Sequence, residues 1–403
     1  MRRREMLGTV GIGVGSVGVG GCLRLQGEDE EPTADGETSD TGVNDENRDG
    51  GEDGAGEATL VENWTAEPGI EYIWTDGGTF YFNGYNAAAE AAHGSGLQWA
   101  DDVSYDGATD NLAADAFGTD GRYVVFGYIP DPDGYETIGG HFHAYDAVSE
   151  EKVWTFGAPS DGKHNFAIGA TVVDDVAVVA TTDYGPRSEQ EPLVAGIDLA
   201  TGEELWRTDR STLPRSYVQY LGSFGGSVYV GMRSEGAYVL DPDTGSLRAV
   251  REDWDVMKIY GESCGQIHGQ TFFAASRRNG IGAYPIGDTG VSWRNGDVGT
   301  ASTAPAVDNS LVVVGTDSGD VHALDRETGE SQWDTNIGTT VGAVTTSALR
   351  VWVADRDTGL TAYDRSDGTR VHRSTKPVNR SALAVIDDVL LLGGNGARAY
   401  WIE

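Results

Sequence analysis

The chain has 403 residues, and 39% of them are hydrophobic, which is enough to bury the core of one large domain or two ordinary ones. Its formal net charge at pH 7 is −36. A charge of this size repels nucleic-acid phosphates and anionic lipid surfaces, so we exclude both as direct partners.

The basic residues are mostly arginine, because only four of the 28 are lysine. An acidic surface with little lysine is similar to that of proteins from salt-loving archaea, in which carboxylates hold water and salt screens their mutual repulsion. We therefore expect a halophilic protein.

Residues 1–22 have the order of an export signal. Residues 3–7 read RREML, which resembles a twin-arginine motif, and a glycine-rich apolar stretch follows. That stretch is too short and too rich in glycine to span a membrane well. It ends in VGGC, which resembles a lipobox. Cys22 is therefore expected to be lipidated after cleavage and to anchor an exported chain at the cell surface, on the outer face of the cytoplasmic membrane.

Residues 23–57 are expected to form a disordered acidic linker. Between Gly27 and Glu57 there are thirteen acidic residues, one arginine and no aromatic residue, so this segment cannot bury enough apolar surface to fold. Cys264 is the other cysteine of the chain, and it has no partner for a disulfide once Cys22 is lipidated. We expect it to be a small buried residue in a strand.

Residues 58–403 repeat one pattern of strands and turns. Eight segments are typical of β-hairpins with Asp, Asn or Gly at the turn: residues 74–84, 118–127, 172–180, 223–231, 267–276, 306–315, 345–354 and 385–394. A third strand, a turn and a fourth strand follow, as in VHALDRETGESQW at residues 321–333. The repeat markers are Asp146, Asp198, Asp241, Asp325 and Asp364 at the turn, and Trp64, Trp99, Trp154, Trp206, Trp293 and Trp333 in the fourth strand. Two units have lost the Trp, with Ala249 and His372 in its place, and two have lost the Asp, with Ala91 and Pro285 in its place. Helix signals are nearly absent, and the alanine-rich residues 86–92 are interpreted as irregular.

Eight units of about 43 residues have a normal length for four-stranded propeller blades. After residue 372 the chain supplies three strands only, and residues 58–64 supply the missing fourth. We therefore predict an all-β, eight-bladed β-propeller of antiparallel blades, whose last blade is completed by the N-terminal strand. In each unit the Asp and the Thr-Gly pair are expected to shape the turn, and the Trp to cover the junction with a neighbouring blade.

The A-x-D-x-x-T-G-x-x-x-W pattern resembles the repeat of the pyrroloquinoline-quinone-type (PQQ-like) propellers, and the resemblance covers essentially all of residues 58–403. That family includes quinone-dependent alcohol and sugar dehydrogenases. It also includes non-enzymatic lipoproteins, such as the propeller subunit of the bacterial outer-membrane barrel assembly machinery. The resemblance therefore implies a fold and leaves the activity open.

A dehydrogenase is the alternative function. The alcohol-oxidising members of the family carry adjacent cysteines under the quinone, calcium ligands, and long insertions that bury the cofactor. This chain has no adjacent cysteines, and its blades are mostly of minimal length, so PQQ and calcium are expected only under this alternative. We predict no catalytic residue, no metal site and no resident cofactor.

Three further motifs have ordinary explanations that we favour. His141 and His143 lie on one face of a predicted strand, as a two-histidine metal site requires, but they occupy a generic third-strand position. The sequence PDPDG at residues 130–134 is favoured as a solvated acidic turn over a calcium loop. Asn63 and Asn379 begin glycosylation sequons, which arise easily by chance.

Long loops are concentrated in the second to fifth units, and antiparallel connectivity brings them to one face. They supply exposed aromatic and arginine side chains of the kind that anchor interfaces: Tyr128, Tyr135, Tyr184, Arg187, Tyr217, Tyr220 and Trp254. Tolerated insertions are the competing explanation. We predict a monomeric binding or scaffolding module, with an unknown protein or small molecule as its partner.

Overall fold

The computed structural model consists of β-strands and turns, and no helix occurs among the residues that it describes. These are residues 59–66, 72–76, 78–84, 87–92, 96–102, 111–130, 140–158, 166–182, 192–209, 211–233, 235–254, 265–276, 280–355, 359–374, 382–393 and 397–403. The predicted export signal, Cys22, the linker, Asn379 and Cys264 lie outside them. No helix in this part of the chain is long and apolar enough to cross a membrane.

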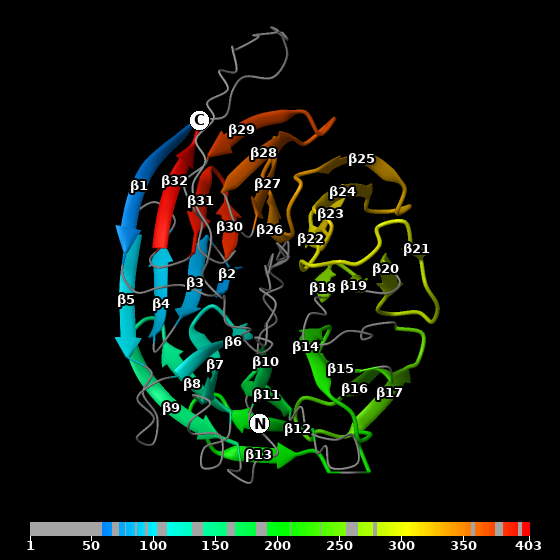
Figure 1. The fold of residues 1–403 in the computed structure, drawn as a ribbon. Helices are drawn as coiled ribbons and strands as arrows, with labels where there is room; N and C mark the ends of the chain where they lie inside the picture. Colours follow the sequence, from blue (N-terminus) through cyan, green and yellow to red (C-terminus); the bar gives the residue numbers. More distant parts are fainter. Residues whose placement is uncertain are drawn as a thin grey trace, which may run out of the picture.

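The described strands form six four-stranded sheets and one eight-stranded sheet (Figure 1). The first sheet in chain order contains β2 (Tyr72–Asp76), β3 (Thr79–Gly84), β4 (Ala87–Ala92) and β5 (Gly96–Asp102). The eight-stranded sheet contains β6 (Asn111–Thr119), β7 (Tyr123–Pro130), β8 (His141–Asp146), β9 (Glu151–Gly157), β10 (Phe166–Val173), β11 (Val176–Thr182), β12 (Leu193–Asp198) and β13 (Glu204–Arg207).

The remaining sheets follow in chain order around a central axis (Figure 1). The next sheet contains β14 (Val218–Phe224), β15 (Ser227–Met232), β16 (Gly236–Leu240) and β17 (Leu247–Arg251), and the one after it contains β18 (Gly265–His268), β19 (Thr271–Ser276), β20 (Gly280–Pro285) and β21 (Trp293–Asn295). A further sheet contains β22 (Ala306–Val307), β23 (Leu311–Gly315), β24 (Asp320–Asp325) and β25 (Ser331–Asn336). It is followed by a sheet of β26 (Val341–Thr346), β27 (Arg350–Asp355), β28 (Leu360–Asp364) and β29 (Arg370–Ser374). The last sheet contains β30 (Leu383–Ile386), β31 (Val389–Leu392), β32 (Ala397–Ile402) and β1 (Leu60–Ala66).

Within each four-stranded unit consecutive strands pair antiparallel, and a tight turn joins the two strands of each predicted hairpin. Val173 of β10 pairs with Val176 of β11 across the turn Asp174–Asp175. Asp174 has φ of 51°, a left-handed conformation that aspartate tolerates better than most residues. The prediction of an all-β fold with antiparallel sheets is confirmed.

The alanine-rich segment was interpreted incorrectly from its sequence. Residues 87–92 form β4, which pairs with β3 on one side and with β5 on the other. Alanine has a low intrinsic preference for strands, so the ladders to the two neighbouring strands decide the conformation here.

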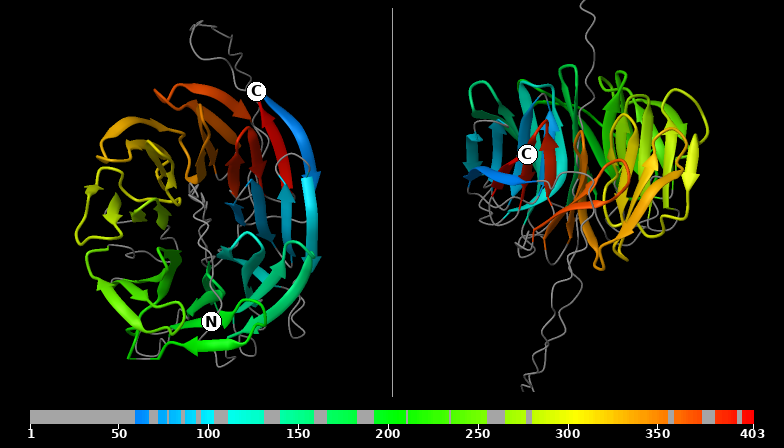
Figure 2. Two further views of the ribbon diagram at one scale, coloured as in Figure 1. Left: turned by 180° about the vertical axis from the view of Figure 1, so that it is seen from behind. Right: turned by 90° about the horizontal axis from the view of Figure 1, so that it is seen from above.

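The first and last strands of the described chain lie side by side. β1 pairs antiparallel with β32, from Leu60 opposite Ile402 to Ala66 opposite Ala397. Beyond the ladder, Thr59 and Glu403 exchange two backbone hydrogen bonds of 3.1 and 3.0 Å. Figure 2 shows the blue N-terminal strand against the red C-terminal strands from behind and from above. The N-terminal strand therefore covers an edge that β32 would otherwise expose.

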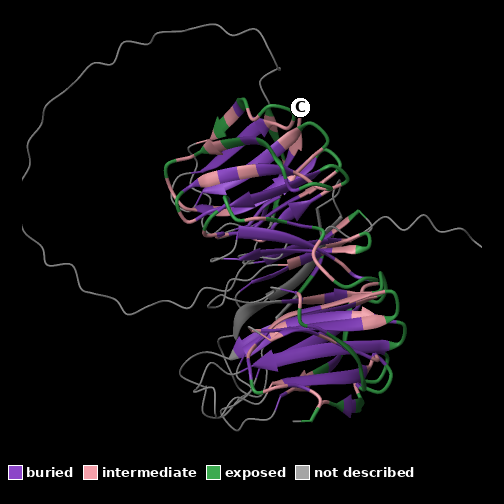
Figure 3. Cartoon of the chain, turned by 90° about the vertical axis from the view of Figure 1, so that its right-hand side faces the viewer, coloured by how far each residue is buried: buried purple, intermediate pink, exposed green. Residues whose placement is uncertain are grey.

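Burial follows from the stacking of sheet against sheet. All seven residues of β11 are buried, because neighbouring strands and neighbouring sheets cover both of its faces. The outermost strands differ: in β9 and β13 the marker tryptophans are buried while the residues on either side of them are exposed. Figure 3 shows the buried residues concentrated in the strands and the exposed ones in the turns. The core is therefore a series of apolar layers between adjacent sheets.

Candidate functional site

The Asp-to-Gly turn is a compact hydrogen-bonded unit. Oδ1 of Asp198 accepts bonds from the backbone N–H of Ala200 (3.2 Å) and Thr201 (2.8 Å), and from the Thr201 hydroxyl (2.7 Å). Gly202 completes the reversal with φ of 76° and donates its N–H to the Asp198 carbonyl at 2.9 Å. The hydrogen bonds from Thr201 hold the pKa of Asp198 below its ordinary value, because they stabilise the charged carboxylate.

The same unit recurs along the chain. Asp241 and Asp325 each bind the N–H and hydroxyl of the threonine three residues later, and Asp364 binds Ser366 in the same way. The pKa of each of these carboxyls is also lowered, first by Arg248 for Asp241, by Thr328 for Asp325 and by Ser366 for Asp364. The carboxylates of these repeat residues therefore stabilise the turns through hydrogen bonds within each turn.

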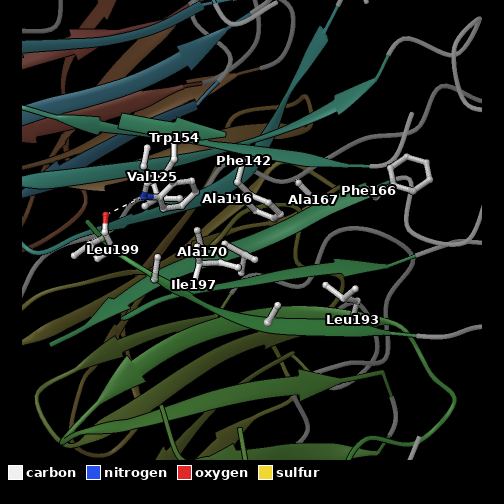
Figure 4. Close-up of a cluster of buried hydrophobic side chains, with 14 of the residues drawn as sticks. Ala116, Val125, Phe142, Trp154, Phe166, Ala167, Ala170, Leu193, Ile197 and Leu199 are labelled. Atoms are coloured by element: carbon white, nitrogen blue, oxygen red, sulfur yellow. Dashed lines mark hydrogen bonds between the residues drawn. The ribbon is translucent and has the colours of Figure 1, made fainter. Parts of the chain in front are cut away.

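Four marker tryptophans bridge one four-stranded unit to the next. Each donates its indole Nε1–H to the backbone carbonyl of the residue that follows the repeat aspartate in the next unit. The four bonds are Trp154 to Leu199 (2.8 Å), Trp206 to Pro242 (2.6 Å), Trp293 to Arg326 (2.9 Å) and Trp333 to Arg365 (2.9 Å). Figure 4 shows the first of these bonds within the surrounding apolar cluster. Each indole also packs on the glycine of that next turn, at Gly202, Gly245, Gly329 and Gly368 respectively.

The other two marker tryptophans also contact a neighbouring sheet. Trp99 of β5 stacks on Tyr145 of β8, with ring centroids 4.9 Å apart. Trp64 of β1 is partly buried against the apolar cluster that contains Ile73 and Phe80 of the first sheet. All six tryptophans thus lie at junctions, where each buries a large aromatic side chain.

The junction between β14–β17 and β18–β21 is built differently. Ala249 stands where six of the units have Trp and the β26–β29 unit has His372, and it is exposed. Arg251, two residues later on the same face of β17, is buried instead. Its guanidinium donates to the carbonyls of Ile286 (2.8 Å), Pro285 (2.9 Å) and Asp288. In the β18–β21 unit, Pro285 holds the position of the repeat aspartate and Ile286 follows it. Arg251 therefore bonds the carbonyl that a marker tryptophan bonds in other units.

A carboxylate completes this arginine junction. Asp253 lies 3.4 Å from the Arg251 guanidinium and accepts the N–H of Gly290 at 2.8 Å. Burial opposes ionisation of Asp253, but the hydrogen bonds of Arg251 and Gly290 prevail and lower its pKa. Sequence reasoning missed Arg251 because it aligned the unit on the lost tryptophan. An arginine two residues beyond that position, on the same strand face, was the available signal.

Trp254 and Tyr128 are not exposed anchors. Trp254 is 1% exposed and lies between Tyr229 and Phe272, with ring centroids at 5.5 and 4.6 Å and nearly parallel planes. Tyr128 is fully buried against His141 and His143, with centroids at 5.8 and 5.5 Å. The expectation of exposure was wrong for both residues, because each packs between sheets rather than projecting from a loop.

The other members of the predicted binding face are only partly accounted for. Tyr217 is partly buried, with the Arg233 guanidinium 5.0 Å from its ring. Tyr220 packs on Phe272 at 4.8 Å, and burial raises its pKa. Tyr135, Tyr184 and Arg187 lie outside the described residues, so the structure does not bring the predicted set together.

The two histidines are core residues. His141 and His143 are fully buried, their rings meet at right angles 5.2 Å apart, and Nδ1 of His143 lies 2.9 Å from the Thr155 hydroxyl. Among the described residues no group of three or more His, Cys, Asp or Glu side chains could hold a metal ion.

Comparisons with known proteins agree on the architecture. A family model described as outer membrane protein assembly factor BamB matches residues 89–335 and 277–403. No curated protein matches the chain. The crystal structure of BamB from Moraxella catarrhalis is 17% identical with a TM-score of 0.62, and the match covers 85% of this chain and 100% of that one.

Two further solved structures are similar. The computationally designed Ika8 protein is 15% identical with a TM-score of 0.64, over 87% of this chain and 100% of that one. The quinohemoprotein alcohol dehydrogenase ADHIIG from Pseudomonas putida HK5 is 12% identical with a TM-score of 0.60, over 85% of this chain and 76% of that one. At these identities each likeness concerns the fold alone.

Proposed function

The chain belongs to the PQQ-like repeat family described as outer membrane protein assembly factor BamB, and we propose that it is a protein-binding scaffold. The family match supports this proposal, because it spans most of the repeat region and carries the description of an assembly factor. The repeat residues support it as well. Their polar groups are used in turns and junctions, which makes the propeller a rigid frame on which loops can present a binding surface.

We further propose that the frame has eight blades and is closed by the N-terminal strand. The six four-stranded sheets and the eight-stranded sheet together contain eight four-stranded units. Within the eight-stranded sheet the two units are joined by one pair, Ala170 opposite Phe117. The pairing of β1 with β32 supplies the support for closure, because it joins the two ends of the described chain.

The proposed location is the outer face of the cytoplasmic membrane of a halophilic cell. Its support comes from the sequence: the twin-arginine-like residues, the lipobox ending at Cys22, and the acidic residues that follow. The loop face with Tyr135, Tyr184 and Arg187 is retained as the proposed partner-binding face. Its aromatic and arginine residues are the types that dominate interface energies.

The proposal is tested by capture from salt-extracted membranes of the native host. The full chain, tagged at the C-terminus, is expected to retain a defined partner protein at native salt. The triple substitution Tyr135→Ala, Tyr184→Ala, Arg187→Ala is expected to lose that partner while melting within a few degrees of the parent. Failure of the parent chain to retain any protein would contradict the scaffold proposal.

The enzymatic alternative has its own measurement. The purified chain is incubated with pyrroloquinoline quinone and calcium, and reduction of an electron acceptor is followed with alcohols and sugars. We expect no turnover. Stoichiometric quinone uptake with substrate-dependent turnover would favour a dehydrogenase, independently of the capture result.

A further inference from the structure

The outermost strand of the last sheet carries a modification motif. Residues 63–65 read Asn-Trp-Thr, which is an N-x-T glycosylation sequon, and they lie within β1. The chain has one other sequon, at Asn379, which lies outside the described residues. The sequence alone favours a chance occurrence. The position of the motif in the fold decides whether the acceptor asparagine is accessible.

The repeat places both sequon side chains on the outside of the molecule. Trp64 is the marker tryptophan of its unit and packs against the first sheet. In β9, β13 and β25 the marker tryptophan is buried, and the residues directly before and after it are exposed. Asn63 and Thr65 hold these two positions in β1, where Thr65 is exposed and Asn63 is partly exposed. Because side chains alternate along a strand, packing of Trp64 directs the amide and the hydroxyl of the sequon to the other face.

The backbone ladder of β1 is interrupted at the acceptor. Glu62 lies opposite Tyr400 and Trp64 lies opposite Ala399, so Asn63 is the extra residue of a β-bulge. β1 is also the last strand in the order of its sheet, with β32 along one of its edges (Figure 1). Binding of a transferase to this segment therefore requires the release of one ladder only, at a point where that ladder is already irregular.

The neighbourhood of the acceptor indicates what a glycan does there. β1 is an edge strand, and Val61 on the same strand is 41% exposed. An edge strand with an exposed apolar side chain can pair with the edge of a second chain. A glycan is bulky and hydrophilic, so a glycan on Asn63 covers this edge and opposes such pairing.

We propose that Asn63 is an N-glycosylation site and that its glycan shields the outer edge of the closing strand β1. This proposal rests on the proposed export of the chain, because N-glycosylation is a modification of exported proteins. It is independent of the partner that the scaffold binds.

The modification joins the side-chain nitrogen of Asn63 to a sugar. Nδ2 forms a bond to the anomeric carbon of an oligosaccharide that is carried on a lipid phosphate. The bond between that carbon and the phosphate oxygen breaks, and the lipid phosphate leaves with the proton that the amide loses. The host supplies the lipid-linked oligosaccharide and the transferase, and this chain supplies the acceptor.

Mass spectrometry of the full chain, purified from membranes of the native host, tests the proposal. Thr65→Ala removes the sequon hydroxyl and Thr65→Ser keeps it, and both changes are at an exposed position, so both variants should fold as the parent does. We expect a glycan on the proteolytic peptide that contains Asn63 in the parent and in Thr65→Ser. In Thr65→Ala the occupied fraction should fall at least about tenfold. Thr65→Ala should also self-associate more than Thr65→Ser in sedimentation.

Several results would overturn the proposal. An unmodified Asn63 in the parent chain would do so, and so would equal occupancy in Thr65→Ala and Thr65→Ser. Equal self-association of these two variants would exclude the shielding role. The N-terminal peptide of the same sample separates this proposal from export. A cleaved, lipidated Cys22 with an unmodified Asn63 would mean that glycosylation is wrong and export stands, whereas a retained export signal would mean that both fail.

Discussion

The indole of Trp154 lies directly on the backbone of Gly202, so that a β-carbon added to Gly202 would come within 2.6 Å of the Trp154 Cβ. The two residues are 48 positions apart and belong to successive four-stranded units. The turn that contains Gly202 also offers the Leu199 carbonyl to the indole N–H at 2.8 Å. One short turn thus supplies both the apolar surface and the polar partner of the tryptophan, which explains why the Thr-Gly pair and the Trp recur together.

Substitution of Gly202 by alanine should destabilise the chain for two reasons that a control can separate. The left-handed φ of 76° disfavours any β-carbon, and the indole leaves no room for one. We expect a loss of about 2–4 kcal/mol in the free energy of unfolding. Gly226→Ala shares the left-handed conformation, with φ of 71°, but meets no described atom within 4 Å, so it should cost only about 1–2 kcal/mol. Denaturant unfolding of both variants measures the difference, and equal losses would contradict the packing argument.

Arg251 should be among the most sensitive charged residues of the described chain. Arg251→Met leaves the carbonyls of Pro285 and Ile286 and the Asp253 carboxylate without their partner, so we expect a loss of about 3–5 kcal/mol. Arg248→Met, on the same strand but with a side chain 41% exposed, should cost less than about 1 kcal/mol. Thermal unfolding of these variants provides the comparison, and a parent-like melting temperature for Arg251→Met would contradict this account.

Local sequence patterns predicted most of the strands and turns. They failed where contacts with distant residues decide the burial of a side chain or the conformation of a segment. The Asp-to-Gly turn is made by residues within four positions of each other, so its local sequence is sufficient to predict its structure. The burial of Trp254 depends on Tyr229 and Phe272, which come from other strands. Its position next to a long loop therefore suggested exposure incorrectly. Strand β4 was missed for a related reason, since pairing with β3 and β5 overrides the low strand preference of alanine.

The candidate site was harder to predict from the sequence than the fold was. Arg251 bonds the carbonyls of Ile286 and Pro285, which are 35 and 34 positions away in the chain, and only the three-dimensional arrangement places these groups together. The sequence did not indicate this role, because an arginine near a strand end usually lies in solvent. The sequence did show that a marker tryptophan was lost at Ala249, which was the one signal that this junction is different.

Acid should weaken the repeat turns in a defined direction. The pKa of Asp198 is lowered in the folded chain by the hydrogen bonds of Thr201, so its contribution to stability is complete above its unfolded pKa of about 4. That contribution is lost as the pH falls through the folded pKa. Thr201→Val removes the hydroxyl donor and should raise the pKa of Asp198, so the variant should lose less stability than the parent between about pH 5 and pH 3.

Thr208→Val is the control for this pH experiment, because the Thr208 hydroxyl bonds the backbone of Val194 rather than a carboxylate. It should shift the free energy of unfolding by the same amount at every pH. The measurement is denaturant unfolding across the pH series. A parallel pH profile for Thr201→Val and the parent would contradict the assignment.

The N-terminal strand should stabilise the last sheet. Trp64 is partly buried against the first sheet, so Trp64→Ala should cost about 1–3 kcal/mol. Val61→Ala, on the same strand at a side chain 41% exposed, should cost no more than about 0.5 kcal/mol. Deletion of residues 59–66 uncovers the edge of β32 and should lower the melting temperature and promote association, which sedimentation detects. A monomeric deletion variant with the parent melting temperature would argue against closure by this strand.

Membrane attachment should depend on Cys22, since a thioether-linked lipid is the apolar anchor that the sequence predicts. Cys22→Ser should therefore move the chain from the membrane fraction to the soluble fraction of lysed native cells at unchanged salt. Cys264→Ser is the matched control, because it removes the other cysteine and leaves the lipobox intact, and it should stay with the membranes. Without the lipid, the chain should not adsorb to the membrane directly, because its net charge of −36 is repelled by anionic lipid headgroups. Sedimentation of Cys22→Ser with membranes in the parent proportion would show that another attachment holds the chain there.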